Sequence, residues 1–158
     1  MTENLKLARP YLVLLAIFTV GRWLFGTFHV PYEKGTHVFS IVTLTLYASA
    51  FYGAFSRRWR GFRLWRAAGL AMTLGVISQA VIFAVTVLSY GLGLHTYFIY
   101  PTALLGPDAA GTEVAFGQAV VSRLGGLIVN MILAGIAGSL GWALGGLLPE
   151  SGAQASHT

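Results

Sequence analysis

The sequence contains no cysteine and few charged side chains, since lysine, arginine, aspartate and glutamate make up only 9% of its 158 residues. A soluble domain carries about 25% charged residues, so this composition excludes an ordinary soluble protein. The absence of cysteine excludes disulfide bonds, thiolate metal ligands and catalysis by a thiol. Acidic residues are the scarcer charged class, at 5 against 10 basic residues.

The rest of the chain is strongly apolar, with 56% hydrophobic residues. Four long apolar segments occupy residues 11–30, 36–55, 67–94 and 120–148. A helix of about 20 residues is about 30 Å long, which matches the hydrocarbon core of a bilayer. The sequence therefore predicts an all-α polytopic membrane protein, a four-transmembrane-helix bundle. We expect one membrane domain over residues 1–149 and a disordered polar tail over residues 150–158.

Residues 56–66 fix the orientation. This segment contains five arginines and no acid, so it is expected to form a loop at a membrane surface, and positively charged loops stay cytoplasmic. Lys6 and Arg9 fall on the same side and Lys34 on the other, which predicts that both termini are cytoplasmic.

The excess positive charge of the chain gathers in residues 56–66 and so does not indicate nucleic-acid binding. A high content of arginine and glycine favours a bacterial source, and hence the inner membrane.

Two polar residues are expected to cap helices, because Thr and Asp side chains accept hydrogen bonds from the amides of a first helical turn. Thr36 would begin the second span, and Asp108 would cap a helix that starts at Ala109. Residues 96–101 are rich in aromatic side chains and suit a membrane interface.

Two arginines, Arg22 and Arg123, lie within the outer halves of the first and last apolar segments, and none of the four segments contains an acid. An ionisable residue inside a membrane is a functional hypothesis by default. Two interpretations remain open. Either Glu33 or Glu113 pairs with an arginine, or the two arginines hold an anionic group that enters from outside, for which guanidinium geometry is well suited.

Polar side chains recur at helical spacing in each apolar segment and are expected to face inward, because a polar group that faces lipid has no partner. The series are Thr19, Arg22, Gly26 and His29; Ser40, Thr43, Tyr47, Ala50 and Ala54; Gln79, Phe83, Thr86 and Tyr90; and Arg123 with Asn130. Such series either hold helices together or line a site. We predict a polar pocket in the outer half, and its ligand-binding residues would be Arg22, His29, His37, Tyr90, Arg123 and Asn130.

Three histidines, His29, His37 and His95, are expected at the outer rim of the bundle. Imidazoles from separate helices can bind a metal ion or a haem. The histidine spacings do not support this interpretation, since no pair lies one helical turn apart. A haem- or metal-binding role is therefore the lesser alternative, and the sequence indicates no particular cofactor.

The last apolar segment carries small residues on one face, at Gly135, Gly138, Gly141 and Gly145. Small residues let helix backbones approach closely in a membrane. We expect this face to pack either within the bundle or against a second copy of the chain.

Together these features favour a binding or accessory subunit over an enzyme, because the sequence shows neither an intramembrane carboxylate nor a recognisable pair of nucleophile and base. The expected partners are the lipid bilayer, an anionic lipid or small anionic ligand, and a homo-oligomer or larger membrane complex. The alternative is a small enzyme or transporter that acts on an anionic lipophilic substrate.

Overall fold

The computed structural model describes residues 6–147, which are helical apart from turns and contain no strand. The predicted tail at residues 150–158 and the end of the last predicted span, Leu148, lie outside the described residues. Four of the helices in the described range are long: α2 (Arg9–Thr27), α4 (Ile41–Arg60), α5 (Leu64–Gly91) and α7 (Phe116–Gly145). Three elements are short: α3 (Tyr32–Gly35), α6 (Pro101–Leu105) and the 3₁₀ helix η1 (Pro107–Ala109).

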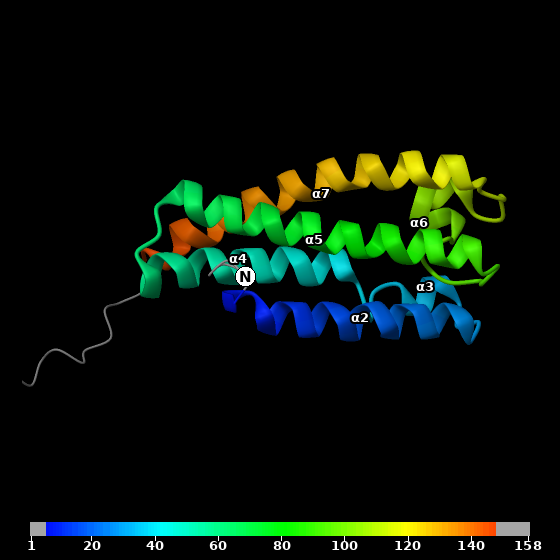
Figure 1. The fold of residues 1–158 in the computed structure, drawn as a ribbon, viewed down its shortest axis with the longest axis horizontal. Helices are drawn as coiled ribbons and strands as arrows, with labels where there is room; N and C mark the ends of the chain where they lie inside the picture. Colours follow the sequence, from blue (N-terminus) through cyan, green and yellow to red (C-terminus); the bar gives the residue numbers. More distant parts are fainter. Residues whose placement is uncertain (1–5, 148–158) are drawn as a thin grey trace, which may run out of the picture.

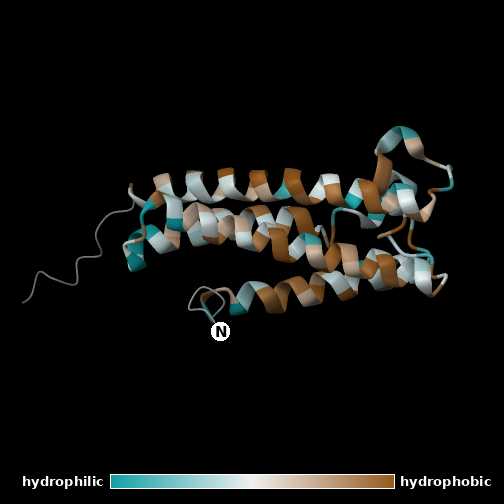
Figure 2. Ribbon diagram, turned by 45° about the horizontal axis from the view of Figure 1, so that its top comes forward, coloured by the Kyte–Doolittle hydropathy of each residue, from teal (hydrophilic) through white to brown (hydrophobic). Residues whose placement is uncertain are grey.

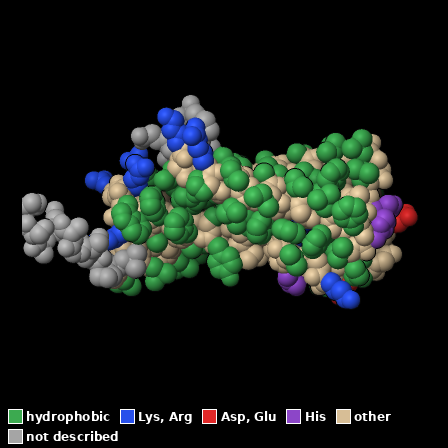
Figure 3. Space-filling view, turned by 90° about the horizontal axis from the view of Figure 1, so that it is seen from below, with side chains coloured by type: hydrophobic (Ala, Val, Ile, Leu, Met, Phe, Trp, Pro, Cys, Tyr) green, Lys and Arg blue, Asp and Glu red, His purple; other side chains and the backbone are tan. Residues whose placement is uncertain are grey.

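Successive long helices run antiparallel, so the turns between them lie at two opposite ends of the molecule (Figure 1). One end holds the turn between α4 and α5, and both ends of the described chain lie toward it. The opposite end holds α3, in the connection from α2 to α4, and α6, in the connection from α5 to α7. Lysine and arginine gather at the first end, whereas histidine and acidic side chains appear at the second (Figure 3). We call these the basic end and the histidine end.

Within residues 6–147, three helices, α2, α5 and α7, are long and apolar enough to cross a membrane. Hydrophobic residues cover most of the helix lengths, and most hydrophilic residues lie toward the two ends (Figure 2). Helix α4 is as long as a bilayer requires, at 20 residues, but it carries Arg57, Arg58 and Arg60 in its last turn and hydroxyl side chains along its length.

Helices α4, α5 and α7 form a tightly packed group because α7 presents glycine to its neighbours. The glycines of this face are all buried: Gly135, Gly138, Gly141 and Gly145. A Cβ at Gly145 would lie 2.6 Å from the carbonyl oxygen of Ala54, and a Cβ at Gly141 would overlap the carbonyl of Ala50. The backbones of α4 and α7 therefore meet directly, with no room for a methyl group between them.

Helix α2 lies beside α4 and α5 and keeps a broad apolar face exposed, with Val13, Ile17 and Val20 each more than half exposed. Its buried side includes Tyr11, whose hydroxyl lies 3.0 Å from Thr45 Oγ1 and donates to the carbonyl of Leu74 at 3.4 Å. This one phenol therefore joins α2 to both α4 and α5.

Three predicted boundaries are wrong. Helix α4 begins after Ser40, whose hydroxyl accepts a hydrogen bond from the Thr43 amide, and Thr36 instead lies in the turn after α3. The predicted loop at residues 56–66 is mostly helical, because α4 continues to Arg60 and only Gly61, at φ 60°, ends it. Arginine is a good helix former, and its long side chain reaches water from within a helix.

The third boundary concerns Asp108, which lies inside η1 and caps no helix. Pro107 and the positive φ of Gly106, 101°, confine this segment to a single short 3₁₀ turn. The next helix, α7, begins only at Phe116.

The predicted inward series on α4 is wrong at Thr43 and Tyr47, which are exposed, Tyr47 by 74%. Its last two members, Ala50 and Ala54, do face inward, because they meet the glycines of α7.

The hydroxyl side chains that are buried on α4 are those of Thr45, Ser49 and Ser56. Small hydroxyl side chains can be buried here because most of them bond to a carbonyl of their own helix, as Thr45 does to Ile41 at 2.7 Å. Residue size therefore predicts better than polarity which side of α4 meets α7.

Candidate functional site

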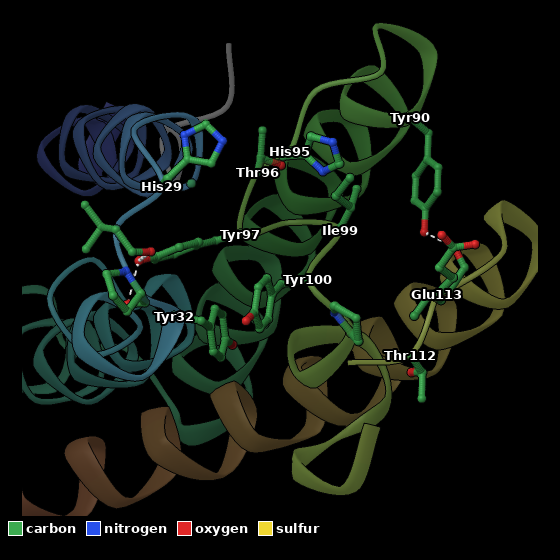
Figure 4. Close-up of a pocket in the computed structure, with 15 residues that line it drawn as sticks. His29, Tyr32, Tyr90, His95, Thr96, Tyr97, Ile99, Tyr100, Thr112 and Glu113 are labelled. Atoms are coloured by element: carbon green, nitrogen blue, oxygen red, sulfur yellow. Dashed lines mark hydrogen bonds between the residues drawn. The ribbon is translucent and has the colours of Figure 1, made fainter. Parts of the chain in front are cut away.

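The histidine end contains a pocket of about 530 Å³. Its walls come from the end of α2, from α3, from the end of α5 and from the segments that flank α6 and precede α7 (Figure 4). The residues that line it are Gly26, His29, Val30, Pro31, Tyr32, Tyr90, His95, Thr96, Tyr97, Ile99, Tyr100, Pro101, Thr112, Glu113 and Val114. Four tyrosines make the walls aromatic, and the polar groups lie among them.

Tyr97 anchors one wall of the pocket. Its hydroxyl donates to the carbonyls of Val30 at 2.7 Å and Pro31 at 3.0 Å, which ties the segment after α5 to the turn after α2. Its ring packs on Gly35, where a Cβ would lie 2.8 Å from Tyr97 Cε2. Burial raises the pKa of the Tyr97 hydroxyl, so the phenol stays protonated and keeps donating.

Stacked rings form the neighbouring wall. The Tyr32 and Tyr100 rings lie 4.6 Å apart and nearly parallel, at 8°, and Tyr97 meets Tyr32 edge-on at 5.1 Å. These contacts join α3 to the segment before α6. Aromatic pairs of this geometry contribute stabilising energy, so these contacts hold the wall in place without a ligand.

The polar groups of the pocket fall into two sets. The Tyr90 hydroxyl donates to the carbonyl of Val114 at 2.7 Å, and the Tyr97 hydroxyl is bonded as described above. By contrast, the side chains of His29, His95, Tyr100 and Glu113 form no hydrogen bond or ion pair within residues 6–147. These four are therefore the groups open to a ligand.

Arg22 lies behind the aromatic wall rather than in the pocket. Its guanidinium group donates to the carbonyl of Thr36 at 3.2 Å and to the Tyr32 hydroxyl at 3.4 Å. It also lies 5.8 Å from the centre of the Tyr32 ring and 5.7 Å from that of Tyr97, within the range of a cation–π interaction. Arg22 thus holds α3 and the wall tyrosines in place.

Arg123 supports the same wall from α7. Its Nε donates to Thr86 Oγ1 at 3.1 Å, and its terminal nitrogen donates to the carbonyl of Phe98 at 2.6 Å. Within the part of the chain that the structure describes, neither Arg123 nor Arg22 pairs with a carboxylate. Carbonyls, hydroxyls and ring faces take the place of the acid in both cases.

The six predicted ligand-binding residues fall in four places. His29 and Tyr90 line the pocket, and Arg22 and Arg123 lie behind its walls. His37 is exposed outside the pocket. Asn130 bonds to the carbonyl of Gly126 on its own helix at 2.8 Å.

The three rim histidines do not come together. His29 and His95 both line the pocket, whereas His37 does not. Among residues 6–147 there is no group of three His, Asp or Glu side chains that could hold a metal ion.

Sequence reasoning did not place Tyr32, Tyr97, Tyr100 or Glu113 in the pocket. One signal was available: residues 96–101 put three aromatic side chains in the connection between two long helices. A connection that folds back over the bundle brings such rings to the helix ends, where a pocket forms.

Comparison of the chain with models of protein families, with curated proteins and with solved structures finds no match. The functional argument therefore rests on the chemistry of the pocket.

Proposed function

We propose that the protein is an integral protein of a bacterial inner membrane with four spans and both termini in the cytoplasm. Three spans are the apolar helices α2, α5 and α7. The support for α4 as the fourth is its packing, since its backbone meets that of α7 at Ala50 and Ala54. A helix held this closely along a spanning neighbour lies at the same membrane depth.

The proposed orientation rests on the distribution of charge. The exposed residues Arg60, Arg63 and Arg66 lie around the turn between α4 and α5, at the end toward which the start of the described chain, with Lys6 and Arg9, also lies (Figure 1). The positive-inside rule assigns this end to the cytoplasm. The pocket at the opposite end then opens at the outer surface, at the level of the lipid headgroups.

For the pocket we propose a binding role: it takes an amphiphilic ligand with an anionic headgroup, and the protein acts as a binding or accessory subunit of the membrane. The observation that carries this proposal is the imbalance of charge around the pocket. Arg22 and Arg123 stand behind its walls without a described carboxylate partner, and Glu113 is the single acid among the lining residues. Two guanidinium charges in a region of low dielectric favour an anion in front of them.

The lining groups suit such a ligand in a second way. The tyrosine walls and Ile99 offer apolar contact for an alkyl chain or ring, and His29, His95 and Tyr100 can donate hydrogen bonds to an acidic headgroup. The arginines do not grip the ligand directly in this proposal. They contribute their field and hold the walls.

The test is native mass spectrometry of the protein purified in a non-ionic detergent. We expect an acidic amphiphile to copurify with the wild type and to be lost from Ile99→Trp, because the indole fills the pocket. Val38→Trp, at an exposed position outside the pocket, is the matched control and should keep the ligand. A ligand retained by Ile99→Trp, or a bound species without an acidic group, would overturn the proposal.

A further inference from the structure

Helix α2 ends in a backbone motif whose left-handed position is usually occupied by glycine. The amide of Val30 donates to the carbonyl of Phe25 at 3.0 Å, and the amide of His29 donates to that of Gly26 at 3.1 Å. These two hydrogen bonds define a Schellman motif, which places its penultimate residue in the left-handed region. That residue here is His29, at φ 57°, and it is the single non-glycine residue with positive φ among residues 6–147.

Helix α5 ends in the same motif and supplies an internal comparison. The amide of Leu94 donates to the carbonyl of Ser89 at 2.9 Å, and the amide of Gly93 donates to that of Tyr90 at 3.3 Å. Here the left-handed position holds Gly93, at φ 63°. Glycine adopts this conformation without steric cost, whereas a residue with a Cβ is strained in it.

No hydrogen bond or ion pair of the His29 side chain within the described chain offsets the strain of its backbone conformation. Its imidazole is exposed and has no hydrogen-bonding partner within the described chain. It lines the pocket from the α2 side (Figure 4). Strained residues that persist without a structural benefit occur preferentially at functional sites.

The surroundings of His29 determine which ligand group its side chain meets. The titratable residues that face the pocket from the other elements are Tyr32 on α3, Tyr90 on α5, His95, Tyr97 and Tyr100 after α5, and Glu113 before α7. On its own helix, Arg22 lies behind the wall. Both His29 and His95 follow a helix C-terminus, where the helix dipole favours a positive charge.

We propose that His29 is a direct ligand contact, whose imidazole N–H donates a hydrogen bond to the acidic headgroup, and that this contact is the reason for histidine rather than glycine at the left-handed position. This inference rests on the proposed function.

The experiment measures binding of decane-1-sulfonate by calorimetry in a non-ionic detergent. The sulfonate supplies an acidic headgroup on an alkyl chain. We expect His29→Gln to weaken binding about threefold, since the amide can still donate a hydrogen bond, and His37→Gln, outside the pocket, to leave the affinity unchanged.

His29→Gly separates binding from stability. It should weaken binding by about tenfold, because the hydrogen bond to the acidic headgroup is lost, while its melting temperature equals or exceeds that of the wild type. A lower melting temperature would contradict the strain argument, and unchanged affinity in both His29 variants would overturn the contact. In either case binding by the wild type leaves the proposed function standing. If the wild type binds no sulfonate, the proposed function itself fails.

Discussion

Arg22 and Arg123 meet at one residue, Phe98. The guanidinium group of Arg22 lies 5.8 Å from the centre of the Phe98 ring, and Arg123 donates a 2.6 Å hydrogen bond to the Phe98 carbonyl. Phe98 is only 1% exposed, so two positive side chains from the first and last long helices hold the same buried residue. The segment that forms the pocket wall is thereby fixed from both sides.

Arg123→Gln should lower the free energy of unfolding by about 2 kcal/mol, because Thr86 and the Phe98 carbonyl lose hydrogen bonds from a charged donor. Unfolding in detergent, followed by circular dichroism, measures the change. Glu113→Gln is the control and should be neutral, since Glu113 pairs with no described residue. If both variants destabilise equally and the double variant recovers part of the loss, an ion pair holds Arg123 instead.

Gly141→Ala should destabilise the protein by about 1–3 kcal/mol, because the added methyl group would overlap the carbonyl of Ala50. Gly125→Ala lies on the same helix with nothing within 4 Å of its added Cβ, and it should be neutral or stabilise by up to about 1 kcal/mol. Melting temperatures of the two variants in one detergent test the difference. Equal melting temperatures would show that α7 is not held at this contact.

Arg57→Gln should cost about 1–2 kcal/mol of stability, whereas Arg60→Gln should change it by less than about 0.5 kcal/mol. Arg57 donates to the carbonyl of Trp142 at 3.2 Å, and its guanidinium group lies 4.0 Å from the centre of the Trp142 ring. It therefore binds a carbonyl in the last turn of α7. Arg60 is exposed. Chemical denaturation of the two variants distinguishes a structural arginine from one that serves only the membrane surface, and a larger loss from Arg60→Gln would contradict this assignment.

Single cysteines give a clean topology test because the natural sequence has none. A cysteine at Arg63 should react with a membrane-impermeant maleimide only after the cells are opened, and a cysteine at Ala110 should react in intact cells. Both positions are exposed, so the reagent can reach them. Labelling of both positions from the same side would show that the number of spans between them is even.

The sequence predicted a helical chain and the apolar helices α2, α5 and α7, because a run of about 20 apolar residues is long enough to cross a bilayer as a helix. It also marked Gly141 and Gly145 as positions of close contact, since small residues at a spacing of four lie on one helix face. It did not predict that α4 would continue to Arg60, because charge indicates a membrane surface without showing where the helix ends.

The candidate site was less accessible to sequence reasoning. Arg22 and Arg123 were expected to meet either an acid or a ligand, whereas in the described chain their donors meet backbone carbonyls and hydroxyl groups, and their charges face no carboxylate. Those carbonyls come from the turn after α3 and from residues 96–98, which are distant in sequence. Spacing within one helix carries no information about a carbonyl that another segment brings to it.

The direct contact of α4 with α7 constrains the order of assembly during synthesis. Ser49 is completely buried in the finished protein, on the part of α4 that α7 covers, but α7 leaves the ribosome after both α4 and α5. Until α7 arrives, the hydroxyl-bearing face of α4 lacks the neighbour that buries it. A nascent chain that stalls before residue 116 therefore leaves this face of α4 uncovered until translation resumes.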